Sequence, residues 1–337
     1  MGLKNAQESI HLLDISEAYD SGMDDAPNNT SIHISPKVIA YSTPPMHTAT
    51  KRRDLQGLRG VAIIAVLLFH LIPKSFPNGF LGVDIFFVLS GYLMGRIFAK
   101  ESEVTLKVMK TFYIRRIKRI VPVYALVLLF LSIITPIIFA PSDIGLFTTD
   151  LSWALALGTN VQNMLKEVDY WTEIFNYPVV LHAWSLGVEM QFYLAVPFIM
   201  HASKTFTSSQ SKALFLAALA SGSHYVFIAS NPKISFNFML ARVWQFMVGC
   251  LAVEMEAIFD VRKQCVSSIS TQPFEEVEVK PGSGGCLHLV LFILLLVQML
   301  IPFALNQAIL RLVATSLAGL VILTAARNGS TSLLTNR

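Results

Sequence analysis

The feature that most constrains this chain is a succession of apolar runs, each near the length an α-helix needs to cross a bilayer. Crossing takes about 20 consecutive apolar residues in a helix. Only 14% of the 337 residues are charged, whereas a soluble domain carries about 25%. The sequence therefore predicts an all-α fold, a polytopic transmembrane bundle of about eight or nine helices. The predicted segments are residues 57–73, 80–99, 120–140, 144–163, 182–201, 213–230, 235–257, 287–304 and 307–326.

The polar flanks of these runs predict how the chain is organised around the membrane. Residues 1–50 are acidic and contain no apolar run, which is typical of a disordered tail. The basic cluster 51–53 stands just before the first apolar run. Because Lys and Arg are enriched on cytoplasmic flanks, we expect a multi-pass membrane protein with a cytoplasmic N-terminus and a membrane domain over residues 51–337.

Two regions depart from the simple spanning pattern. Segment 144–163 has polar residues at both ends, and we interpret it as re-entrant or interfacial rather than as a full span. With that interpretation, the basic loops lie on the cytoplasmic side of the membrane. The acidic loop that follows segment 144–163 lies on the opposite side. The polar stretch 258–286 contains a Gly/Ser-rich run and is predicted to be a flexible insert.

Arg59 and His70 lie inside the first apolar run. Ionisable residues in membrane helices are costly and are usually functional. At 100° and 1.5 Å per residue, the two share one helix face and lie about 16 Å apart along its axis, which would place His70 deep in the bilayer. Imidazole titrates near neutral pH, so we predict that His70 is a base that deprotonates a hydroxyl nucleophile. The alternative is a neutral histidine hydrogen-bonded between helices.

A basic stretch over residues 112–122 contains Arg115, Arg116 and Arg119 at spacings of three and four. Side chains at these spacings converge on one helix face. Guanidinium groups offer forked donors to phosphate oxygens, so the stretch is a candidate phosphate-binding site for a nucleotide-like donor. A purely topological role is the alternative, because cytoplasmic loops are commonly basic.

Two acidic residues, Asp84 and Glu189, lie near or within apolar segments. Asp84 could pair with Arg59 or His70, or remain at the membrane interface. Glu189 lies within an apolar helix, where a carboxylate needs a polar or charged partner. We predict that it orients His70 or binds a sugar hydroxyl, and a buried ion pair with Arg242 is the alternative.

The remaining composition narrows the possible ligands. The three cysteines lack the spacing of a disulfide framework or a zinc site, and we expect no metal. Basic residues gather at the ends of the apolar runs, so we expect membrane lipid and no nucleic acid as a partner.

Five strings of this sequence resemble, in order, those of the acyltransferase-3 family of membrane O-acyltransferases. That family includes bacterial O-acetylases of surface polysaccharide and invertebrate proteins called "nose resistant to fluoxetine". The strings are RRDLQGLRGVAIIAVLLFH at 52–70, GFLGVDIFFVLSGYLM at 79–94, FYIRRIKRIVPVY at 112–124, LHAWSLGVEMQFYLAVP at 181–197 and FMLARVWQFMVG at 238–249.

The resemblance implies transfer of an acyl group, most simply acetyl, from acyl-CoA to a hydroxyl of a carbohydrate or lipid acceptor. The Arg-x10-His motif of the family falls on Arg59 and His70, and its Arg-x-x-Arg motif falls on Arg116 and Arg119. The arginines would hold the phosphates of the donor near the cytoplasmic surface, and the histidine would deprotonate the acceptor.

Two features depart from the family pattern. Gln245 stands where the family usually has Glu, and the last helices of the family are expected to be missing from this chain. Two further hypotheses therefore stay open. One is a transporter or lipid-translocating protein, which also uses intramembrane Arg, His and Glu. The other is a non-catalytic short form of the enzyme.

Overall fold

The computed structural model describes residues 52–166, 179–269, 283–302 and 305–328, and every regular element in these ranges is an α-helix. This confirms the predicted all-α class. The predicted tail over residues 1–50 lies outside the described residues. The helices are α1 (Arg53–Leu71), α2 (Leu81–Ala99), α3 (Leu106–Ile138), α4 (Pro141–Leu155), α5 (Thr159–Leu165), α7 (Ala183–Ser203), α8 (Ser209–Ala229), α9 (Pro232–Asn237), α10 (Met239–Ile269), α11 (Ser283–Leu300) and α12 (Gln307–Asn328).

Five of these helices are long and apolar enough to cross a membrane: α1, α2, α3, α8 and α12. Helix α11 contains a shorter apolar stretch, Gly285–Leu300. Helices α7 and α10 cover most of two further predicted segments. Most of the predicted apolar runs are therefore helices, as a polytopic bundle requires.

Helix α3 shows most clearly why this bundle needs an apolar solvent. Its spanning window is only 11% buried, although its mean hydropathy is 2.5. Large apolar side chains such as Phe130 and Ile137 are 60% and 75% exposed. A soluble protein rarely exposes so continuous an apolar surface. Lipid contact explains it.

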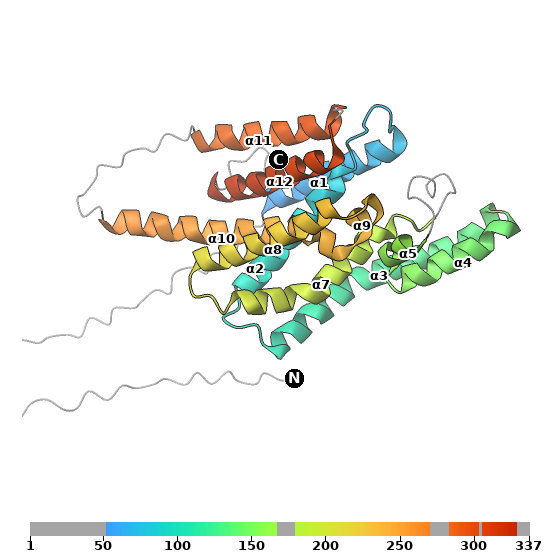
Figure 1. Ribbon diagram of the computed structural model, residues 1–337, viewed down its shortest axis with the longest axis horizontal. Coiled ribbons are helices and arrows are strands. Elements are labelled where there is room, and N and C mark those ends of the chain that lie inside the picture. Colours follow the sequence, from blue (N-terminus) through green and yellow to red (C-terminus); the bar gives the residue numbers. More distant parts are fainter. Residues whose placement is uncertain (1–51, 167–178, 270–282, 303–304, 329–337) are drawn as a thin grey trace, which may run out of the picture. The chain divides into compact units, whose positions relative to one another are not determined.

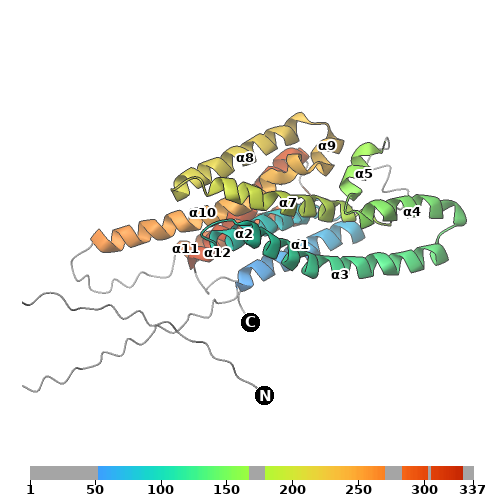
Figure 2. The same ribbon diagram turned by 90° about the horizontal axis from the view of Figure 1, so that it is seen from below.

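The fourth predicted segment is broken rather than continuous. Helices α4 and α5 are 15 and 7 residues long, and both are too short to cross a bilayer alone. Leu157 lies between them with φ of 55°, a left-handed conformation that interrupts the helix. Helix α4 packs beside α3 in both views (Figures 1 and 2), and the Tyr124 hydroxyl donates to the Ala154 carbonyl at 2.8 Å.

The polar stretch over residues 258–286, predicted to be a flexible insert, is helical at both of its described ends. Helix α10 continues to Ile269 and α11 begins at Ser283, while residues 270–282 lie outside the described part. Residues 258–269 contain no Gly or Pro, so nothing in their backbone chemistry ends the helix where the apolar run stops.

Helix α10 is the central packing partner of the bundle and contacts α2, α8 and α12, while α11 packs on α12 (Figure 1). Glycines let α2 and α10 approach very closely. A Cβ placed on Gly91 would overlap the backbone carbonyl of Phe246, and one on Gly249 would overlap the carbonyl of Val88. Small residues are the usual means of close helix packing in membranes.

Gly91→Ala is expected to destabilise the protein strongly, because the added methyl meets backbone that cannot rotate away. Overpacking of this kind destabilises by about 1–3 kcal/mol or more. Gly222→Ala in α8 is the matched control, because no atom lies within 4 Å of its added methyl. Thermal unfolding in detergent should give a lower midpoint for Gly91→Ala and an equal or higher one for Gly222→Ala. Equal midpoints for both variants would contradict this packing.

The helices have two ends that differ in chemistry. At the first, α1 ends at Leu71, α2 begins at Leu81, and α7 and α12 begin; we call it the histidine end. At the second, α1 begins at Arg53, α2 ends at Ala99 and α7 ends at Ser203; we call it the arginine end. The two ends carry the two parts of the candidate site.

Candidate active site

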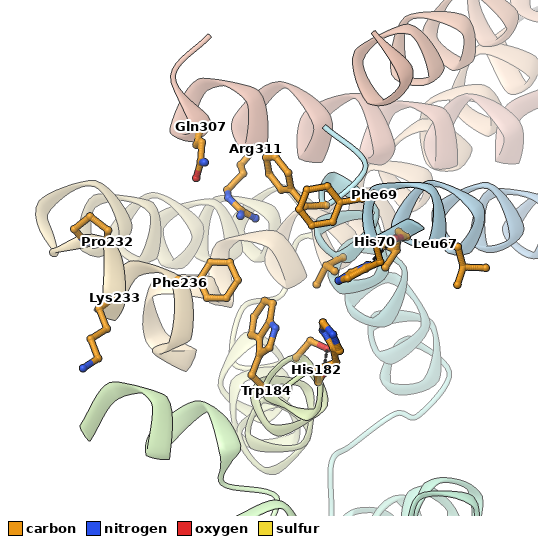
Figure 3. Close-up of a pocket in the computed structure, with 14 residues that line it drawn as sticks. Leu67, Phe69, His70, His182, Trp184, Pro232, Lys233, Phe236, Gln307 and Arg311 are labelled. Atoms are coloured by element: carbon orange, nitrogen blue, oxygen red, sulfur yellow. Dashed lines mark hydrogen bonds between the residues drawn. The ribbon is translucent and has the colours of Figure 1, made fainter. Parts of the chain in front are cut away.

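A cavity of about 480 Å³ lies at the histidine end between α1, α2, α7, α9 and α12 (Figure 3). This is a usual size for a ligand pocket. Its wall is mainly apolar and aromatic, with a few polar groups, which is also typical of such pockets. The polar groups come from His70, His182, Ser185, Lys233, Gln307 and Arg311.

His70 and His182 meet in this cavity. Their rings are perpendicular, with centroids 4.6 Å apart. Nδ1 of His70 lies 2.7 Å from the carbonyl oxygen of Val66. A carbonyl can only accept, so Nδ1 carries the proton and Nε2 of the neutral ring is the nitrogen that can take up another. The geometry therefore presents His70 as a base.

His70 lies near one end of its helix. It lies in the last turn of α1, whereas Arg59 lies in the second turn, so the two occupy opposite halves of the helix. The apolar run ends three residues after His70, at Pro73, and α1 stops at Leu71. The expectation of a base deep in the bilayer stays a prediction.

Helix α7 carries a row of polar side chains from this cavity towards the arginine end. His182, Ser185, Glu189 and Tyr193 follow one another at intervals of three or four residues, so they share one face over about 16 Å. The Glu189 carboxylate accepts hydrogen bonds from the hydroxyls of Ser90 and Tyr193.

Glu189 thus has partners other than those predicted. No hydrogen bond joins it to His70 among the described residues, and the alternative of an ion pair with Arg242 is not supported, because Arg242 binds Asp84. Glu189 is on α7 and Arg242 is on α10, and the Asp84 carboxylate of α2 already occupies the guanidinium.

Arg116 is the basic residue of α3 that reaches this row. Its guanidinium lies 5.7 Å from the centre of the Tyr193 ring and 5.6 Å from that of Phe112. Arg115 and Arg119 are exposed, and no salt bridge holds them in the described part of the chain. The three predicted phosphate ligands are therefore on one helix, with only Arg116 packed against α7.

Arg59 is half-buried and makes no ion pair with another described residue. It lies eleven residues before His70 on α1, which corresponds to about 16 Å of helix. The row on α7 covers the same length. Arg59 and Arg116 thus lie on the arginine-end side of His70.

Asp84 occupies a buried cluster behind the cavity wall. Nη1 of Arg311 donates to both of its carboxylate oxygens at 2.8 Å, Nη1 of Arg242 donates at 3.3 Å, and Nε2 of Gln245 donates at 2.6 Å. The predicted pairing of Asp84 with Arg59 or His70 is wrong, because Asp84 faces α10 and α12 rather than α1. A Glu at Gln245 would set a second carboxylate beside Asp84, so the amide suits this cluster.

A network of side-chain amides supports the opposite wall. Asn160 of α5 and Gln191 of α7 exchange hydrogen bonds at 3.0 and 3.1 Å, and Asn160 also donates to the carbonyl of Asn237 in α9. Gly187 allows this approach, since a Cβ there would meet the Asn160 side chain at 2.6 Å. The network fixes α9, which supplies Lys233 and Phe236 to the cavity.

The arginine end gathers cations. Arg52 and Arg96 bind the Glu256 carboxylate at 3.3 and 3.1 Å. A smaller cavity of about 200 Å³ at this end is lined in part by Lys204 and Lys212. Burial lowers the pKa of the Lys204 ammonium, and the charge of Lys212 lowers it further. This end is the more basic of the two.

Three side chains of the site were not among the predicted site residues. His182 stands seven residues before Glu189, a spacing that already placed both on one face. Arg311 is an intramembrane arginine in the last apolar segment, which is a signal for function in itself. Tyr193 gave no signal, because a tyrosine in an apolar helix is ordinary core.

Comparison with known proteins identifies the family of this chain. A family model described as "Acyltransferase domain" matches residues 52–334. The O-acetyltransferase OatA of Staphylococcus aureus (strain NCTC 8325 / PS 47) is 31% identical over 248 residues, which are 71% of this chain and 40% of that protein. A Staphylococcus aureus (strain COL) protein provisionally named as an O-acetyltransferase is 37% identical over 148 residues, 43% of this chain and 24% of that protein.

These relatives are much longer than the matched region, so this chain spans two fifths of their length or less. No solved structure matches the chain significantly. The family model, however, covers most of the chain, including both predicted arginine motifs and the histidine cavity. The chain thus belongs to the acyltransferase-3 family, and five of its helices are long and apolar enough to cross a membrane.

Proposed function

We propose that the protein transfers an acyl group, most simply acetyl, from acyl-CoA to a hydroxyl of a carbohydrate or lipid acceptor. The observation that carries this proposal is the hydrogen bond from His70 Nδ1 to Val66, which leaves Nε2 as a base in a ligand-sized cavity. The relatives named as O-acetyltransferases support an oxygen acceptor and an acetyl donor.

The chemistry would proceed at the histidine end. Nε2 of His70 takes the proton of the acceptor hydroxyl as its oxygen attacks the thioester carbonyl. His182 packs its ring against His70 and limits the orientations of the base. The mainly apolar wall offers water few partners beside the thioester, which would favour transfer over hydrolysis.

The donor would enter from the arginine end. Its phosphates suit Arg115, Arg116 and Arg119, because guanidinium groups make charge-assisted contacts to phosphate oxygens. Arg59 is a further cation on the path between these residues and His70. The positive-inside rule favours a cytoplasmic arginine end, and so a cytoplasmic N-terminus ahead of α1. Acyl-CoA is available on that side of a membrane.

Arg116→Ala and Arg119→Ala are expected to raise the KM for acyl-CoA and to leave kcat nearly unchanged. Each lost charge-assisted contact corresponds to about 1.5–3 kcal/mol, or roughly 10- to 150-fold in KM. Arg119→Lys should recover part of this, because lysine lacks the planar fork. Lys118→Ala, an exposed cation of the same helix, is the control. If both arginine variants bind acyl-CoA as tightly as Lys118→Ala does, the arginines do not bind the donor. Their role would then be to set the orientation of the helix in the membrane.

The proposal is tested by following free thiol release from acetyl-CoA by the purified protein, with and without hydroxyl acceptors. Thiol release that depends on the acceptor supports an acyltransferase. Vesicle-reconstituted protein that moves lipid or solute without thiol release would instead support the transporter hypothesis, which the intramembrane Arg, His and Glu also fit.

A further inference from the structure

We infer that Arg311 binds the carbonyl oxygen of the acyl group and stabilises the negative charge that this oxygen acquires during transfer. The inference rests on the proposed function, because Arg311 would bind the carbonyl oxygen of the acyl group while His70 takes the proton of the acceptor hydroxyl. Arg311 lines the same cavity as His70 and His182, and Figure 3 shows its guanidinium among the aromatic side chains of the wall.

Among the described residues, Arg311 is hydrogen-bonded through one nitrogen, Nη1. Nη1 donates to both oxygens of Asp84 at 2.8 Å. Within the described ranges, no hydrogen bond from its Nε or Nη2 is found, although a guanidinium has five N–H groups. Asp84 thus holds the side chain in place, and donors are left for a ligand in the cavity.

Two aromatic rings fix the orientation of this guanidinium. Its Cζ lies 4.7 Å from the ring centre of Phe80 and 5.5 Å from that of Phe236. Such contacts are favourable, and more so away from water. Only 4% of Arg311 is exposed, so its remaining donors are held in an environment of low dielectric. Preorganised donors in such an environment are the most effective stabilisers of developing charge.

The other cations near the cavity are less suited. Lys233 also lines it, but Figure 3 shows its amino group directed away from Phe236 and Trp184. Arg242 binds Asp84 and the carbonyl of Phe236 and does not line the cavity. Arg311 is therefore the guanidinium that a ligand beside the histidines can reach.

Nε2 of His70 accepts the hydroxyl proton while the acceptor oxygen forms a bond to the thioester carbon, and the C=O electron pair moves to the carbonyl oxygen. Arg311 donates to that oxyanion. The pair then returns to re-form C=O, the C–S bond breaks, and His70 gives its proton to the departing thiolate.

The first test compares Arg311→Gln, Arg311→Lys and the control Lys74→Gln, which removes an exposed cation at the same end outside the cavity. Loss of one oxyanion donor lowers kcat by about 10²–10³-fold. We expect that loss in Arg311→Gln with a nearly unchanged KM for acyl-CoA, and a smaller loss in Arg311→Lys. Millimolar guanidinium ion should restore part of the kcat of Arg311→Ala. A folded Arg311→Gln with wild-type kcat, or with only a raised KM, overturns the inference.

The second test needs no turnover. Methanesulfonate carries a negative charge on a tetrahedral centre, as the intermediate of acetyl transfer does, and its methyl group gives a single NMR signal. Saturation transfer to that signal should be present with the wild type, with His70→Ala and with Lys74→Gln, and absent with Arg311→Gln. Its absence with the wild type, or its persistence with Arg311→Gln, overturns the inference. Binding without thiol release would contradict the proposed function and leave the anion site standing.

Because Arg311 is also a partner of Asp84, its variants need a folding control. The double variant Arg311→Gln with Asp84→Asn replaces this ion pair by two neutral amides that can still hydrogen-bond, and the amide oxygen at position 84 can still accept from Arg242. If this variant unfolds at the same temperature as the wild type and still lacks both kcat and the methanesulfonate signal, the loss is that of the guanidinium donor. If it regains either, the role of Arg311 is structural and the inference is wrong.

Discussion

His70→Ala is expected to lower acyl transfer by at least about 100-fold without changing the stability of the protein. The reason is that Nε2 is the candidate base, oriented by the hydrogen bond from Nδ1 to the Val66 carbonyl. Apart from its hydrogen bond to the Val66 carbonyl, the side chain contacts aromatic rings and is exposed to the cavity, so its removal leaves no buried polar side chain without a partner. Steady-state thiol release measures the effect.

The matched control for this prediction is His201→Ala. His201 is exposed in the last turn of α7, away from the cavity. Its variant should keep the wild-type rate. His182→Ala should fall between the two, because it removes the ring that packs on His70 but leaves the base. A well-folded His70→Ala protein that keeps the wild-type rate would contradict the assignment.

Asp84→Leu is expected to have the largest effect on stability of any single substitution discussed. The Asp84 carboxylate is fully buried and accepts from Arg311, Arg242 and Gln245. Its removal leaves the Arg311 guanidinium in an apolar interior without the carboxylate that binds it. Breaking a buried ion pair from one side destabilises a protein by about 3–5 kcal/mol. Chemical denaturation in detergent, or loss of the folded fraction on purification, measures it.

Two other variants make this prediction specific. Asp84→Asn keeps a hydrogen-bond acceptor at the centre of the cluster and should be less harmful. Asp260→Asn removes an exposed carboxylate of α10 and should leave stability within about 0.5 kcal/mol of the wild type. Equal stability of Asp84→Leu and Asp260→Asn would show that the cluster does not hold α2 to α10 and α12.

Local sequence pattern was enough to predict the class of the fold and most of the helices. Long apolar runs have few alternatives in a membrane, because a helix satisfies all of its own backbone groups. The ends of helices were harder to predict. Helix α10 continues to Ile269, past the end of its apolar run. Leu157 breaks the fourth segment through a left-handed backbone conformation that a leucine side chain does not predict.

The site was predictable only as far as charge in apolar segments reveals it. His70 and Arg59 stood out for that reason, and Arg311 in its apolar segment carried the same signal. The partners of Asp84 could not be predicted, because Arg242 and Arg311 follow it by 158 and 227 residues. Which of several buried cations meets a carboxylate depends on how α2, α10 and α12 pack, and single-sequence periodicity contains no such information.

Transfer of the acyl group to oxygen by way of His70 is tested most directly by one measurement. Isotope-labelled acetyl-CoA is supplied to the protein in proteoliposomes with a hydroxyl acceptor, and the labelled ester is quantified by mass spectrometry. We predict labelled ester in amounts equal to the CoA released, and none with His70→Ala. CoA release without ester, or undiminished ester formation by His70→Ala, would contradict the account.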